Sequence, residues 1–414
     1  MVQSTRHLRS VRPVIAILIV LAVGACAPAA GPAPSAASAP AAQPTQPAKP
    51  AASQSTAAPT ASAPASAAQS PAGGAGAGAA SIAGAAGQAA LPTTPTVSLK
   101  VAAVPIAAFA PYFIGKARGH FAEMGLDVEI VPVASVIEIL PSLAQGQVQV
   151  SACTANVACL NFLNRRTDVQ IVAGLQSAGK TEKSRNSVGL VVRQDLWDSG
   201  AIRGPQDLPG HTVHLIGGEG STPHVHVARW LLRNGVDPHS VEIAALGFPD
   251  VYAAMQNKAS ELGYQTEPLL SGGIARGVHH LLAGLEDLDP GVQELYVMYW
   301  TGIDRLGPQV GERFAVGLLR ATREYLNAFE YGENQDAVID VLTQETPIKD
   351  PAVYRQIHYP WIDPDGTYSR QSLESDADLL RDLGQVGPID LSQAFEDKYR
   401  QTALQRLGEY RPPQ

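Results

Sequence analysis

The sequence lacks the features that mark several common classes of protein. Methionine and aromatic residues are few and scattered, so no stretch suggests a cofactor box, and we expect no cofactor. No G-x-S-x-G motif is present, and Gly218-Glu219-Gly220-Ser221 has the wrong spacing for a nucleophile elbow. No apolar stretch after Cys26 is long enough to cross a membrane. These absences argue against a cofactor-dependent enzyme, a serine hydrolase and an integral membrane protein.

Positive charge is also scarce. The formal net charge is −8 at pH 7, and removal of residues 1–25, which contain three arginines and no acidic residue, lowers it to about −11. A chain of this charge is a poor partner for nucleic acid or for an anionic bilayer surface.

The first residues resemble an export signal. Arg6, Arg9 and Arg12 precede an apolar run from Val14 to Val23, which suits a signal peptide and is short for a membrane span. Val23-Gly24-Ala25-Cys26 resembles the lipobox of bacterial lipoproteins, which implies cleavage before Cys26 and a lipid on its thiol. The alternative is an ordinary cleaved signal with an incidental cysteine. Either interpretation places the mature chain outside the cytoplasm.

A low-complexity segment follows, and we assign residues 26–96 to a tether. It consists mainly of Ala, Pro, Ser, Gly, Gln and Thr, with Lys49 as its single charge. Such a composition cannot bury enough apolar surface to offset chain entropy, so we expect disorder. A lipid anchor followed by a long disordered tether predicts a folded domain that moves near a membrane without being embedded in it.

The rest of the chain alternates short strands with helices. The pattern predicts strands over 97–104, 126–133, 148–152 and 169–173, and helices over 109–124, 136–145 and 156–165. Alternation of this kind predicts parallel sheets with ligand sites at the carboxyl ends of the strands. Cys153 and Cys159 fall at a predicted strand-to-helix turn, where two separate buried thiols are favoured over a disulfide.

Several segments resemble a known family. "ARGHFAEMGLDVEIVPV" (117–133), "LPSLAQGQVQVSACTANV" (140–157) and "RRTDVQIVAGLQS" (165–177) are similar to the opening of solute-binding proteins of ABC importers, of the nitrate, taurine and alkanesulfonate type. That group also includes binders of thiamine-pyrimidine precursors. Later segments, among them "GGEGSTPHVHVARWLLRNGVDPHSVEI" (217–243) and "ELYVMYWTG" (294–302), continue the resemblance over nearly all of residues 98–408. Gln149 and Glu261 stand where the family commonly has Asp, so the ligand of any one family member is not a safe guide to the ligand of this chain.

The resemblance implies an α/β fold of the type II periplasmic-binding-protein kind. Each of two lobes would be a mostly parallel sheet flanked by helices, and a hinge of two crossings would join them. We assign residues 97–186 and 298–414 to lobe 1 and residues 187–297 to lobe 2. An ABC permease and a small-molecule ligand are the implied partners, and we expect a monomer.

"GLQSAGKT" (174–181) fits the phosphate-loop pattern G-x-x-x-x-G-K-[ST] at every fixed position. A phosphate loop requires a helix directly after it, because the helix N-terminus supplies part of the field that holds the anion. Six polar residues, 182–187, and then a strand-like run follow instead. We therefore interpret the segment as the loop of the first crossing between lobes.

Four histidines, His211, His214, His224 and His226, raise the question of a zinc site. His224 and His226 lie just inside a predicted helix start, where a spacing of two points them to different faces. We therefore favour polar or capping histidines and expect no metal.

Candidate ligand contacts lie near the predicted strand ends of both lobes. Hydroxyl and amide groups at helix starts can share the helix N-terminus with a bound anion or carbonyl. Aromatic candidates have core packing as their alternative role. The candidates are Phe109, Tyr112, Ser135, Thr154, Asn156, Ser221, Thr222, His224, Tyr264, Glu267, Trp300 and Thr301, with neighbouring Tyr299.

These features predict a lipid-anchored, extracytoplasmic receptor that is not an enzyme. It would capture a small polar organic molecule, such as a sulfonate, a carboxylate or a nitrogen heterocycle. We expect an anionic or carbonyl end toward Thr154 and Ser221, and the other end against an aromatic side chain. A sensor lipoprotein that docks to a receptor, and an enzyme of the pyrimidine-synthase type on the same fold, are the alternatives.

Overall fold

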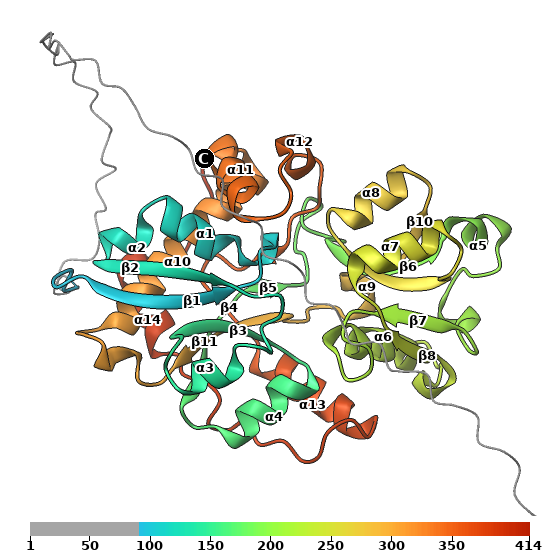
Figure 1. The fold of residues 1–414 in the computed structure, drawn as a ribbon, viewed down its shortest axis with the longest axis horizontal. Coiled ribbons are helices and arrows are strands. Elements are labelled where there is room, and N and C mark those ends of the chain that lie inside the picture. Colours follow the sequence, from blue (N-terminus) through green and yellow to red (C-terminus); the bar gives the residue numbers. More distant parts are fainter. Residues whose placement is uncertain (1–90) are drawn as a thin grey trace, which may run out of the picture. The chain divides into compact units, whose positions relative to one another are not determined.

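The computed structural model describes residues 91–414. The predicted signal peptide, Cys26 and nearly all of the predicted tether lie outside the described residues. Two five-stranded sheets with flanking helices form the described part (Figure 1). None of the helices in residues 91–414 is long and apolar enough to cross a membrane.

The first sheet, here called sheet 1, has the strand order β2-β1-β3-β11-β4. Its strands are β1 (Val97–Ala103), β2 (Leu126–Pro132), β3 (Val150–Thr154), β4 (Val169–Gly174) and β11 (Leu295–Trp300). β1 pairs in parallel with β2 and β3, whereas β11 runs antiparallel to both β3 and β4. The sheet is therefore mixed, because the chain returns from the second sheet and inserts β11 between β3 and β4.

The predicted helix over 109–124 is wrong as a single element. The structure has α1 (Ala110–Ala117) and α2 (His120–Glu123), and Gly119 between them has a φ of 81°. Glycine adopts this left-handed conformation at no steric cost, so the chain turns there. The helix predicted over 136–145 is also shorter, since α3 spans only Leu140–Ala144.

Both faces of sheet 1 are covered. Alternation in β1 places Val97, Leu99 and Val101 in one core cluster with residues of α1 and α10 (Val310–Leu326). A second cluster contains side chains of α3, of α4 (Val157–Arg165) and of α13 (Arg370–Asp382). These clusters fix the positions at which the strands end.

The second sheet, here called sheet 2, has the order β10-β6-β9-β7-β8. Its strands are β6 (Val188–Arg193), β7 (Thr212–Leu215), β8 (Glu242–Ala245), β9 (Leu262–Thr266) and β10 (His279–Gly284). β7 is parallel to β8 and β9, and β6 is antiparallel to β9 and β10. The flanking helices are α5 (Gln194–Ser199), α6 (Thr222–Arg233), α7 (Phe248–Gln256), α8 (Leu269–Ala275) and α9 (Leu285–Leu288).

The chain passes from sheet 1 to sheet 2 between β4 and β6 and returns between β10 and β11. All of β11 lies in sheet 1, so sheet 1 resumes at Leu295 rather than at residue 298. β5 (Gln176–Ser177) pairs with β12 (Trp361–Ile362) beside the first crossing. The remaining elements are α11 (Gln335–Glu345), α12 (Pro351–Tyr354), α14 (Lys398–Leu407), a π-helical turn η5 (Asn327–Tyr331) and 3-10 turns η1 (Ala107–Phe109), η2 (Pro205–Asp207), η3 (Pro238–Ser240) and η4 (Ile303–Arg305).

Candidate ligand-binding site

The strand directions bring several loops to the same edge of each sheet. β4 runs in the same direction as β3, because β11 lies between them and is antiparallel to both. β10 runs in the same direction as β9, because β6 lies between them and is antiparallel to both. The carboxyl ends of parallel strands form the usual ligand edge of an α/β sheet. We call the residues after these ends the strand-end loops: 104–106, 133–139, 155–156 and 175 in sheet 1, and 216–221, 246–247 and 267–268 in sheet 2.

The loop between β3 and α4 is held by its own side chains. Asn156 caps α4, since its Oδ1 accepts the Cys159 N–H at 2.9 Å, and its Nδ2 donates to Thr154 Oγ1 at 2.6 Å. Cys153 and Cys159 form a disulfide, so the prediction of separate thiols is wrong. The turn from β3 into α4 brings their Cα atoms to 6.2 Å, which is within disulfide range.

The loop between β7 and α6 depends on glycine. Gly217, Gly218 and Gly220 have φ values of 81°, 63° and 72°, which side chains with a Cβ rarely adopt. The loop ends at Ser221, whose Oγ accepts the His224 N–H at 3.4 Å and donates to the Gly218 carbonyl at 2.6 Å. His224 Nδ1 in turn accepts the Gly220 N–H at 3.0 Å.

His224 is therefore a positioning residue in this structure. Its Nδ1 must be unprotonated to accept the Gly220 N–H, and burial lowers the pKa of the imidazole. Thr222, the first residue of α6, is 5 % exposed, and its Oγ1 has no hydrogen-bond partner.

The loops of the two sheets meet at the starts of α4 and α6. Val157, the first residue of α4, donates its N–H to the Gly220 carbonyl at 3.0 Å. A Cβ on Gly220 would lie 2.5 Å from Val157 Cγ2, so the approach requires glycine. The structure thus brings together Thr154, Asn156, Ser221, Thr222 and His224.

Glu267 lies at the carboxyl end of β9 and connects two segments. Its Oε1 accepts from Ser271 Oγ at 2.5 Å and from the His358 N–H at 3.3 Å, and its Oε2 accepts the Ser271 N–H at 3.1 Å. Burial raises the pKa of the Glu267 carboxyl, although these hydrogen bonds oppose the shift. Within residues 91–414, no Lys or Arg is a hydrogen-bond or ion-pair partner of the Glu267 carboxyl group.

The structure buries four of the aromatic candidates in the cores of the two sheets. Phe109 and Tyr112 are 1 % and 0 % exposed in the core of sheet 1, where Tyr112 donates its hydroxyl to the Ser151 carbonyl. Tyr264 is 1 % exposed, and its hydroxyl lies 3.0 Å from His226 Nδ1. Tyr299 is also buried in the core. The packing alternative accounts for all four aromatic residues.

Three candidates stand apart from the contact between α4 and α6. Ser135 Oγ accepts the Ile137 N–H at 3.3 Å within the loop after β2. Trp300 packs against Gly146 and Gly302, and Thr301 is exposed. Their roles in binding remain predictions.

Two fully buried polar side chains, on opposite faces of sheet 2, each keep an atom without a partner. Gln265 Nε2 donates to the Phe248 carbonyl at 2.9 Å, and its fully buried Oε1 has no partner. Burial lowers the pKa of the fully buried His226 to about 3, and its Nε2 also has no partner. Gln265 belongs to no motif, so no sequence signal identified it, whereas His226 was considered in the sequence only as a metal-ligating, polar or capping histidine.

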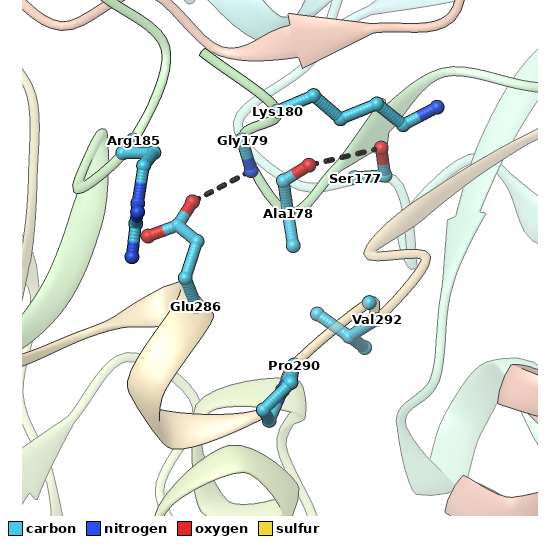
Figure 2. A pocket seen from close by; sticks show the side chains of 9 residues that line it. Ser177, Ala178, Gly179, Lys180, Arg185, Glu286, Pro290 and Val292 are labelled. Atoms are coloured by element: carbon cyan, nitrogen blue, oxygen red, sulfur yellow. Dashed lines mark hydrogen bonds between the residues drawn. The ribbon is translucent and has the colours of Figure 1, made fainter. Parts of the chain in front are cut away.

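The segment that fits the phosphate-loop pattern lines a cavity of about 280 Å³ beside the crossings (Figure 2). The Gly179 N–H donates to Glu286 Oε1 at 2.6 Å, and the N–H groups of Lys180 and Thr181 donate to Ser184 Oγ. Turns follow up to β6, so the required helix is missing. The segment lies between β4 of sheet 1 and β6 of sheet 2, so the interpretation as the loop of the first crossing is confirmed.

Within residues 91–414, no group of three or more His, Cys, Asp or Glu side chains could hold a metal ion. His211 contacts Glu261 at 2.7 Å, and His214 contacts Ser260 at 2.9 Å. His224 and His226 bond to Gly220 and Tyr264, so the four histidines have separate partners.

Comparison with solved structures defines the class: the chain has the fold of periplasmic binding proteins. The alkanesulfonate-binding protein SsuA from Xanthomonas axonopodis pv. citri, bound to MOPS, is similar with a TM-score of 0.57 and 16 % identity, over 75 % of this chain and 100 % of that one. The nitrate-binding protein NrtA from Synechocystis PCC 6803 gives 0.58 and 15 %, over 75 % and 89 %. The aliphatic sulphonate binding protein SsuA from Escherichia coli gives 0.57 and 15 %, over 72 % and 92 %.

More specifically, residues 106–268 match the model of the NMT1/THI5-like family. This match and the structural neighbours confirm the resemblance to the nitrate, sulfonate and thiamine-precursor binding group. Comparison with curated protein sequences gives no match.

Proposed function

We propose that the chain is the solute-binding component of an ABC importer, held outside the cytoplasm by a lipid on Cys26. It would capture a small polar organic molecule between the strand-end loops of the two sheets and deliver it to a permease. The observation that carries the proposal is the meeting of these loops, where the Val157 N–H bonds to the Gly220 carbonyl. The structural neighbours described above include sulfonate-binding and nitrate-binding proteins, which agrees with the proposal.

In this proposal, sheet 1 and its flanking helices act as one lobe and sheet 2 and its flanking helices as the other, with the second boundary just before Leu295. The two crossings allow the lobes to separate and to close, as in other hinge-closing proteins. Desolvated polar contacts form only when groups from both lobes engage the ligand, so affinity depends on closure. The closed, loaded surface is what a permease would recognise.

The ligand itself is the first test of this function. Untargeted mass spectrometry of the purified protein should find one small molecule retained in the folded state and released by heat. Thr154→Ala and Ser221→Ala should each weaken its binding by about 1 kcal/mol in calorimetric titration, because a buried partner loses its hydrogen bond. Ser199→Ala, at the end of α5, is the control and should bind normally. If no small molecule is retained or bound from a metabolite extract, the chain is not a solute receptor.

The lipid anchor makes a separate prediction. Cys26→Ala should move the protein from the membrane fraction to the soluble fraction, because the predicted lipid on this thiol is its only anchor. The melting temperature should not change, since Cys26 precedes the folded residues. A variant that remains with the membrane would contradict the lipoprotein assignment.

A further inference from the structure

The helix starts at the proposed site have few hydrogen-bond donors left for an anion. An oxyanion bound at helix N-termini needs free backbone N–H groups or basic side chains. The N–H groups of Val157 and Cys159 in α4 already bond to Gly220 and Asn156. In α6 the His224 N–H bonds to Ser221 Oγ, and Pro223 has no N–H.

Charge at the site is also unfavourable for an anion. The strand-end loops contain no Lys or Arg, and their charged residues are Glu138, Glu219 and Glu267. Three lysines near these loops in the sequence are engaged elsewhere: Lys100 pairs with Glu129 at 3.6 Å, Lys180 pairs with Asp363 at 3.1 Å, and Lys183 donates to the Glu330 carbonyl at 2.6 Å. Residues 91–414 contain 26 Lys and Arg against 38 Asp and Glu, so the wider field also repels anions.

Besides the Thr222 hydroxyl, which has no partner, the side-chain groups that remain are mainly acceptors. The Glu267 carboxylate accepts three hydrogen bonds. A carboxylate can accept about four, so it can accept one more from a ligand. On the same face of β9, two residues earlier, Gln265 Oε1 is fully buried and lacks a donor. An acceptor without a donor in this region favours a ligand that supplies an N–H group.

Apolar surface occurs at the same edges. Ile106, Ile137 and Ile216 are 42 %, 43 % and 41 % exposed, and each stands in a strand-end loop, after β1, β2 and β7. Covering an exposed isoleucine with an apolar surface is favourable, because it removes apolar area from water. The ligand therefore needs an apolar body as well as a donor.

We infer that the solute of this site is an organic cation, with an ammonium or amidinium group at the Glu267 side and an apolar body against the isoleucines, rather than an oxyanion. This inference rests on the proposed function and narrows its ligand class. It distinguishes this chain from the nitrate-binding and sulfonate-binding proteins of the same fold. The carboxylate of Glu267 would receive the cationic N–H group that the protein itself does not supply.

A series of molecules of one size tests the inference. Calorimetry and thermal shift on the purified chain would compare benzamidine, benzamide, benzoate and benzenesulfonate, which share a phenyl ring and differ in charge. Benzamidine should bind about tenfold or more tightly than benzamide, equivalent to about 1.4 kcal/mol. Its binding should weaken as salt rises, because the attraction is partly electrostatic. Benzoate and benzenesulfonate should give no measurable binding.

Variants locate the binding. Glu267→Gln should reduce benzamidine affinity by about tenfold. Glu345→Gln, at the end of α11, removes a carboxylate outside the strand-end loops and should have no effect. Tighter binding of benzenesulfonate or nitrate than of benzamidine would overturn the inference and leave the proposed function intact. No binding of benzamidine to the wild type also overturns it, while retention of any small molecule in the mass-spectrometric test would still support a solute receptor.

Discussion

Replacing Arg229 with methionine is expected to lower the free energy of unfolding by about 3–5 kcal/mol. Arg229 lies on α6 and forms ion pairs with Asp289 at 3.0 Å and with Asp376 of α13 at 2.5 Å. It also donates to Ser375 Oγ at 2.7 Å. Both carboxylates are nearly inaccessible, at 5 % and 1 % exposure, so removal of the guanidinium leaves two buried acids without a cation. Urea unfolding would measure the loss, and a loss below about 1 kcal/mol would contradict this account.

The same cluster makes stability depend on pH. Burial raises the pKa of Asp376 to about 7 and of Asp289 to about 6. In the unfolded chain both titrate near pH 4, so between about pH 4 and pH 7 the folded protein binds more protons. The free energy of unfolding therefore falls as pH rises through this window, by up to about 1.4 kcal/mol per pH unit for each group. Asp376→Asn should reduce this dependence, with Asp289 and the buried Glu294, whose pKa is raised to about 7, contributing the remainder. Asp382→Asn, an exposed carboxylate on the same helix, should preserve it.

Arg313→Met is expected to cost about 3 kcal/mol of stability. Arg313 lies on α10 and is fully buried, and its guanidinium donates to the carbonyls of Met124, at 2.6 Å, and of Gly125. Methionine fills similar space but leaves the Met124 carbonyl unpaired, at about 1–3 kcal/mol, and removes one of the two donors to the Gly125 carbonyl, which keeps the Val97 N–H. Denaturant unfolding would measure the change in free energy.

Arg320→Met is the matched control for this prediction. Arg320 lies on the same helix, and its ion pair is with Glu123, which is largely exposed. Exposed pairs of this kind contribute at most about 1 kcal/mol. Equal losses for the two variants would show that the carbonyl contacts of Arg313 are not what stabilises the junction of α2 and β2.

Local patterns predicted most of the first part of sheet 1. The alternation of Val97, Leu99 and Val101 and the glycine at position 125 determine β1 and the end of α2, and both depend on neighbouring residues. The insertion of β11 between β3 and β4 could not be predicted in this way. Its pairing joins residues more than a hundred positions apart, and periodicity carries no information on the order of strands.

In the candidate site, too, local features could be predicted and long-range contacts could not. Asn156 and Ser221 were predicted from their positions before helices, and both cap those helices in the structure. The contact of Val157 with Gly220 depends on how the two sheets approach each other, which no local pattern encodes. The Cys153–Cys159 disulfide was missed because a spacing of six residues does not determine the distance between two Cα atoms.

The central claim is that one small molecule is held by strand-end loops of both sheets. A crystal structure of the protein with its retained molecule tests this claim most directly. We predict density for one molecule that contacts the loops after β1 or β3 in sheet 1 and the loops after β7 or β9 in sheet 2. A molecule bound to one sheet alone, or in the cavity beside Gly179 and Glu286, would contradict the claim.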